Sequence, residues 1–167
     1  SIKIPVAVKI GSNFTNLPAF VSNLKAHGAK GVVMFNRFYS PDIDIKKLRI
    51  FPADAFSYPE EYLKELRWMG IVSALVNGID LSASTGIHNG TIVLKQILAG
   101  ATTAQMCTSL YKKGADAISN AIADLNLFMD TQGFKNISDF RGKLNYANIE
   151  NPEKFERVQF MKSFGSK

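Results

Sequence analysis

The sequence predicts an α/β fold in which four parallel strands alternate with helices, as in one half of a TIM (β/α)8 barrel. Short, nearly continuous apolar runs each precede a stretch with helical periodicity. Part of this unit repeats, because Gly28-Ala29 lies six residues before Met34 just as Gly100-Ala101 lies six residues before Met106. The glycine fingerprint of a dinucleotide fold is missing, and 167 residues are about half of the roughly 250 in a complete barrel.

The composition fits one folded domain rather than a disordered, fibrous or membrane-spanning chain. Hydrophobic residues make up 46% and charged residues 20%, and no apolar run reaches the roughly 20 residues of a bilayer span. The single cysteine, Cys107, excludes an internal disulfide and favours a reducing, cytoplasmic location. The net charge of +6 comes from scattered basic residues, which favours a solvated surface over a nucleic-acid interface.

The first half of the chain contains two strands, each followed by a helix. Residues 5–10 and 31–35 have the continuous hydrophobicity of strands buried on both faces. Apolar residues at helical spacing predict a helix over about 17–27 that stops at Gly28. A proline-rich excursion with a small hairpin then leads to a helix over about 60–76.

The second half repeats the pattern and ends in helices. We expect strands over 78–84 and 102–107, helices over 89–99, 115–129 and 137–144, and a loop over 108–114. On this division residues 1–150 form the C-terminal half of a barrel and residues 151–167 form a mobile tail. Four strands cannot close, so we expect an uncovered apolar inner face and self-association into a homo-oligomer.

Polar clusters follow the predicted strands, where the reactive face of a barrel lies. They are Lys9, Asn36-Arg37, Thr85-Gly86-Ile87-His88 and Cys107-Thr108. The last two clusters predict a phosphate site built from backbone N–H groups, with Gly86 allowing close approach and Thr108 adding a hydroxyl. A lysine in a buried strand needs an anion or a polar cofactor, so Lys9 belongs to this site. His88 fits either a helix cap or a ligand contact.

Several segments in this order resemble the C-terminal half of a dihydroorotate dehydrogenase, and more closely the bacterial dihydroorotate dehydrogenase-like subgroup. The segments are Pro5-Val-Ala-Val-Lys9, Gly28-Ala-Lys-Gly-Val-Val-Met-Phe-Asn36, Phe35-Asn-Arg-Phe-Tyr-Ser-Pro-Asp-Ile-Asp44, Thr85-Gly-Ile-His88, Leu98-Ala-Gly-Ala-Thr102, Gln105-Met-Cys-Thr108, Asp139-Phe-Arg-Gly-Lys143 and Phe155-Glu-Arg-Val-Gln-Phe-Met-Lys162. Together they span nearly the whole chain.

The resemblance implies an FMN-dependent oxidoreductase of pyrimidine metabolism with the flavin across the mouth of the barrel. Lys9 matches a lysine that binds the pyrimidine edge of the flavin, and Asn36 an asparagine that binds the planar substrate. Gly86 and Ile87 match the first phosphate turn, and Cys107 and Thr108 match the second. Arg37 replaces a serine of the family, which favours a carboxylate or another anion as substrate.

The resemblance also implies that these residues alone are catalytically inactive. The general base, a cysteine or serine in the family, lies on a loop of the N-terminal half, which this sequence lacks. Cys107 matches a phosphate-turn position, so we expect a packed, inert thiol. Asp42 and Asp44 are expected to form a turn rather than a metal site.

Two other functions fit the same residues. A barrel-type lyase or isomerase would bind a phosphorylated substrate and use Lys9 as an amine nucleophile. A non-catalytic module would bind RNA or another anion through the net positive charge.

Overall fold

A parallel sheet organises the computed structural model, which describes residues 2–38 and 40–156. Its strand order is β1-β2-β5-β6, with β1 (Ala7–Ile10), β2 (Gly31–Met34), β5 (Asp80–Ser84) and β6 (Thr103–Gln105). Every neighbouring pair in this sheet is parallel, which confirms the predicted fold class and all four predicted strands. The row is open, with β1 and β6 at its two edges.

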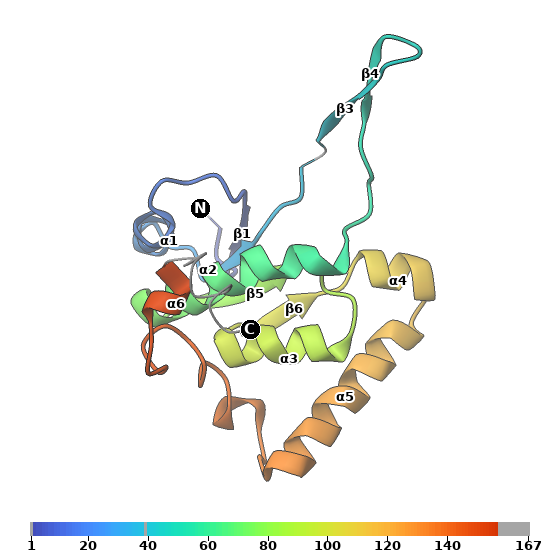
Figure 1. Ribbon diagram of the computed structural model, residues 1–167. Helices are drawn as coiled ribbons and strands as arrows, with labels where there is room; N and C mark the ends of the chain where they lie inside the picture. Colours follow the sequence, from blue (N-terminus) through green and yellow to red (C-terminus); the bar gives the residue numbers. More distant parts are fainter. Residues whose placement is uncertain (1, 39, 157–167) are drawn as a thin grey trace, which may run out of the picture.

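Helices follow the strands in the predicted order, as Figure 1 shows. They are α1 (Leu17–Ala26), α2 (Tyr62–Leu75), α3 (Gly90–Ala99) and α5 (Asp116–Gln132). Side-chain caps begin two of them: Asn16 accepts a hydrogen bond from the amide of Ala19, and Asn89 accepts one from that of Ile92. In the part of the chain that the structure describes, no helix is both long and apolar enough to cross a membrane.

The two faces of the sheet differ in chemistry. One face contributes Val32, Met34, Leu81 and Ala83 to the hydrophobic core, which the helices complete. The register puts Lys9, Val33, Ser82 and Thr103 side by side on the opposite face. Ser84 and Gln105 lie on the same face, two residues further along β5 and β6. The expectation of an apolar inner face is therefore wrong, because polar residues dominate it.

Burial also differs between central and edge strands. β2 is buried at all four positions, whereas β1 is buried only at Ile10 and β6 at none. The prediction that the first strand is covered on both faces is therefore wrong. An edge strand has a neighbour on one side only, so a continuous apolar run does not reveal its exposure.

The proline-rich excursion forms a two-stranded arm, as predicted. Its strands β3 (Pro41–Asp44) and β4 (Arg49–Pro52) pair antiparallel, and Figure 1 shows the arm projecting away from the sheet. The Asp44 carboxylate accepts hydrogen bonds from the amides of Lys46 and Lys47, which fixes the turn. Asp44 thus acts as a turn former as predicted, whereas Asp42 lies within β3 opposite Phe51.

Two predicted elements differ in the structure. The predicted loop at 108–114 contains a helix, α4 (Thr108–Lys113), which ends at Gly114 with a φ of 68°. The predicted helix at 137–144 is a single turn, η2 (Ile137–Asp139). After η2 the backbone donates hydrogen bonds to α3, from Gly142 N to Ile97 O and from Leu144 N to Leu98 O. These two amides are therefore not available to continue a helix.

The remaining short elements are η1 (Pro59–Glu61), ahead of α2, and α6 (Glu153–Glu156). Most of the predicted tail, residues 157–167, lies outside the described residues.

Candidate functional site

A cavity of about 160 Å³ lies at the carboxyl ends of β1, β5 and β6. All seven residues that the sequence assigned to a cofactor or substrate line it, namely Lys9, Asn36, Arg37, Gly86, Ile87, Cys107 and Thr108. The fold brings them together because carboxyl ends of parallel strands meet at one edge of the sheet. Ser57, Ser84, Thr85 and Gln105 line it as well.

Lys9 brings a positive charge to the cavity. Its Nζ donates to Ser84 Oγ at 2.9 Å and to Gln105 Oε1 at 3.2 Å. Both acceptors are neutral, and Lys9 forms no ion pair within residues 2–38 and 40–156. Lys9 is exposed on an edge strand rather than buried, so the predicted reason for its role was wrong, but its charge stays available to an anion.

The turn after β5 presents Gly86 and Ile87 to the cavity. Thr85 and Gly86 both have positive φ angles, 83° and 71°. A Cβ on Gly86 would lie 2.4 Å from the backbone nitrogen of Tyr62. Glycine is therefore required for packing against the start of α2, which corrects the expectation that it makes room for a ligand.

Three side chains form a hydrogen-bonded chain at the rim of the cavity. Ser57 Oγ lies 3.1 Å from His88 Nε2 and 3.1 Å from Thr108 Oγ1, and the Ser57 amide also donates to Thr108 Oγ1. Ser57 and Thr108 are each 8% exposed. Sequence reasoning missed Ser57, since it lies in the loop before η1, far along the chain from both partners.

The surroundings of His88 lower its pKa. Burial lowers its pKa from the usual 6.5, a hydrogen bond with Ser57 acts in the opposite direction, and Lys112 and Lys113 of α4 lower it further. His88 precedes the N-cap Asn89, so it contacts the site instead of capping α3.

The residues after β2 reach the cavity from another side. Asn36 is exposed there and lines the cavity. Arg37 forms an ion pair with Glu61, with Nε 3.0 Å from Oε2, and also donates to the Asp54 carbonyl at 2.6 Å. Its guanidinium thus already has an anionic partner.

Glu65 is a buried carboxyl group beside the site. It lies on α2 and is only 3% exposed, and burial raises its pKa to about 9 against the lowering effects of Thr85 and Lys9. It lines a second hollow together with Asn36, Arg37 and Thr85. Glu65 lies four residues before Met69 and seven before Val72, so it shares their buried face of α2. A glutamate on an apolar face of a predicted helix is the sequence signal that would have revealed its burial.

Cys107 differs from its prediction. The thiol is exposed instead of packed, because the short strand β6 ends at Gln105 and Cys107 precedes the first turn of α4 at the cavity mouth. It lines the cavity together with Thr108.

This donor set fits the phosphate end of a ligand such as FMN. It combines a lysine ammonium with two buried hydroxyl groups and a glycine turn, groups that bind oxyanions. The cavity is smaller than the roughly 300–1,000 Å³ of pockets that enclose a drug-sized ligand. The described residues therefore fit a phosphate group, and the rest of a molecule such as FMN would extend beyond this hollow.

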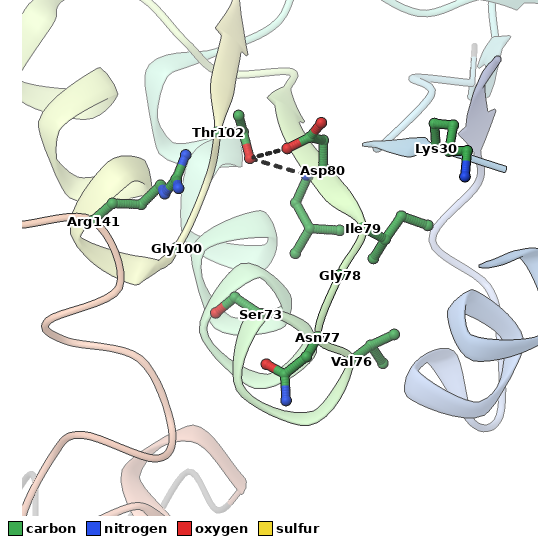
Figure 2. Close-up of a pocket in the computed structure, with 11 residues that line it drawn as sticks. Lys30, Ser73, Val76, Asn77, Gly78, Ile79, Asp80, Gly100, Thr102 and Arg141 are labelled. Carbon is green, nitrogen blue, oxygen red and sulfur yellow. Dashed lines mark hydrogen bonds between the residues drawn. The ribbon is translucent and has the colours of Figure 1, made fainter. Parts of the chain in front are cut away.

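A larger cavity of about 390 Å³ lies at the amino ends of β5 and β6, as Figure 2 shows. Its polar groups bind one another: Thr102 Oγ1 donates to Asp80 Oδ1 at 3.1 Å and accepts from the amide of Leu81. In barrels this end serves stability rather than catalysis. The smaller cavity is the candidate site for that reason.

Comparisons with known proteins connect this geometry to one group of enzymes. The chain is 31% identical to the chloroplastic dihydropyrimidine dehydrogenase (NADP(+)) of Arabidopsis thaliana, over 83% of this chain and 36% of that protein. It is 37% identical to the dihydroorotate dehydrogenase (fumarate) of Lachancea kluyveri, over 40% of this chain and 21% of that protein. The chain is homologous to part of these dehydrogenases.

A solved structure supports the relation at the level of fold. Ligand-free DHODH from Eimeria tenella superposes with a TM-score of 0.66 at 20% identity, covering 81% of this chain and 39% of that chain. The chain thus spans between about a fifth and two fifths of the dehydrogenases that it matches. No protein-family model matches the sequence.

Proposed function

We propose that these residues form the FMN-phosphate-binding part of a dihydroorotate dehydrogenase-like oxidoreductase. One observation carries the proposal: the seven residues chosen from the sequence line a single cavity at the carboxyl ends of the strands. The homology to dihydroorotate and dihydropyrimidine dehydrogenases supports the same chemistry. FMN, when bound, accepts hydride from the substrate.

Each residue has a distinct part in this proposal. Thr108 and the turn at Gly86 and Ile87 bind the phosphate, and Cys107 contributes its backbone. Lys9, already held by Ser84 and Gln105, places a positive charge where it stabilises an anionic reduced flavin ring. The general base is expected from residues other than these, so this chain by itself is expected to be inactive.

The substrate class we propose is a dihydropyrimidine, because one relative is a dihydropyrimidine dehydrogenase and the other a dehydrogenase of dihydroorotate, itself a dihydropyrimidine. Asn36 would bind the amide edge of such a ring, because its side chain offers one donor and one acceptor group. Arg37 would bind a substrate carboxylate only by sharing its guanidinium with Glu61. Dihydroorotate carries such a carboxylate, and an unsubstituted dihydropyrimidine does not.

FMN and riboflavin together test the cofactor proposal, since they differ only in the phosphate. We expect the chain to quench FMN fluorescence at concentrations where riboflavin is unaffected, with a Kd at least about tenfold lower for FMN. Lys9→Met should weaken FMN binding, while Lys135→Met, at an exposed position outside the cavity, should not. Equal or absent binding of both flavins would contradict the proposed function.

A further inference from the structure

Ser57, His88 and Thr108 form a chain of hydrogen bonds that can run in two directions, because each hydroxyl group can donate or accept. When the Ser57 hydroxyl donates, Thr108 Oγ1 accepts from both the amide and the hydroxyl of Ser57, each at 3.1 Å. A hydroxyl has two acceptor lone pairs, so both are used. The only group that Thr108 has left is its own O–H, and Thr108 lines the cavity.

The same count continues to His88. In this direction the Ser57 oxygen can only accept from His88 Nε2, which lies 3.1 Å away; in the opposite direction Thr108 donates to Ser57, and Ser57 donates to an unprotonated Nε2. The first direction therefore requires a proton on Nε2, which the neutral Nε2–H tautomer and the imidazolium both have. An imidazolium cannot accept, so a charged His88 permits the first direction alone.

We propose that His88 is a positioning residue that acts through Ser57 to hold the Thr108 hydroxyl as a donor toward a bound phosphate or sulfate dianion. This inference rests on the proposed function, and it adds a proton-linked control of affinity to that site. A bound dianion and a protonated His88 stabilise each other through these hydrogen bonds. Binding of the dianion therefore favours protonation of His88, and protonation of His88 increases the affinity for the dianion.

Charged groups around His88 set where this coupling operates. Lys112 and Lys113 of α4 oppose its protonation, and Glu61 of η1 favours it. Burial also lowers the pKa of His88 when the cavity has no anion. A dianion beside Thr108 offsets these effects, so binding should raise the pKa of His88, and affinity should increase as pH falls through its titration range.

Inorganic sulfate is the suitable probe, since it stays a dianion over the pH range tested, while a phosphate monoester takes up a proton near pH 6. The chain has only two histidines, so NMR of the imidazole signals follows both. His27, exposed at the end of α1 with Nδ1 2.8 Å from Asn23 O, is an internal control. We expect sulfate to raise the pKa of His88 and to leave the imidazole signals of His27 unchanged. Sulfate should bind at least about fivefold more tightly at pH 5.5 than at pH 8.

Two variants separate the relay, meaning the hydrogen-bonded chain from His88 through Ser57 to Thr108, from a direct effect of the His88 charge on the anion. Ser57→Ala removes the link but keeps His88 and Thr108, and it should weaken sulfate binding about tenfold at pH 5.5 and reduce the pH dependence to less than twofold. His88→Gln keeps a neutral N–H donor, so it should retain the affinity found at pH 8 and lose the increase at low pH. Ser57→Thr, which keeps the hydroxyl, should restore the behaviour of the original chain.

The outcomes distinguish this inference from the function beneath it. Full pH dependence in Ser57→Ala or in His88→Gln overturns the relay, whatever the flavin result. If sulfate binding depends on His88 as expected but FMN binds no better than riboflavin, the relay controls anion binding at this site and the flavin proposal fails. An absence of binding by sulfate and by FMN overturns both.

Discussion

Glu65 is a carboxyl group placed among apolar side chains of α2, and its raised pKa of about 9 makes it neutral at physiological pH. A solvated glutamate titrates near 4.5, so between these two pH values the folded chain holds a proton that the unfolded chain has lost. Neutral Glu65 therefore favours folding at low pH, and this advantage decreases as pH rises toward 9.

We expect the free energy of unfolding to fall between pH 5 and pH 9, with Glu65 contributing a slope of at most about 1.4 kcal/mol per pH unit. Glu65→Gln removes the titration while keeping the shape, so the variant should be more stable than the original chain at pH 9 and lose this part of the slope. Urea denaturation at pH 5, 7 and 9 measures both. A parallel pH dependence in the two proteins would show that Glu65 ionises freely in the folded state.

At the level of elements, the turn between β5 and α3 depends on the start of α2. The carboxyl end of β5 and the Tyr62 backbone approach so closely that Gly86 has no room for a Cβ. This contact fixes the position of the turn, and Thr85, Gly86 and Ile87 of the turn line the cavity.

Gly86→Ala should destabilise the fold by two separable amounts. An alanine at a φ of 71° costs about 1–2 kcal/mol, and the contact at 2.4 Å with Tyr62 adds to this. Gly133→Ala is the matched control, because Gly133 has a φ of 73° and nothing within 4 Å of the added Cβ. In thermal denaturation, the free energy of unfolding of Gly86→Ala should be at least about 2 kcal/mol lower than that of Gly133→Ala. Equal losses would mean that α2 moves aside without cost.

Across the whole molecule, the arm is the largest departure from the barrel pattern. Its strand pairing places Ile43 opposite Ile50 and Pro41 opposite Pro52, so these four share one face. Ile43 is 64% exposed and Ile50 is 75% exposed. The face of the sheet opposite the core, by contrast, carries mostly polar residues, so the arm is the stronger reason to expect self-association.

We expect the chain to form a homo-oligomer through this face of the arm. Ile43→Lys combined with Ile50→Lys should shift the population toward monomer, because two charges would replace the paired apolar side chains. Ile118→Lys combined with Ile122→Lys, at exposed positions of α5, is the matched control and should leave the oligomer intact. Light scattering at high concentration checks this, and a monomer before any substitution would refute it.

The sequence by itself determined the order of strands and helices, the hairpin and the seven residues around the cavity, because these follow from local periodicity and from which residues come directly after each strand. The tertiary structure decided which strands are exposed, that the inner face is polar, and that Ser57 meets His88 and Thr108. It also decided the pKa of Glu65. Burial and contacts between distant residues depend on neighbours in space, which no local pattern specifies.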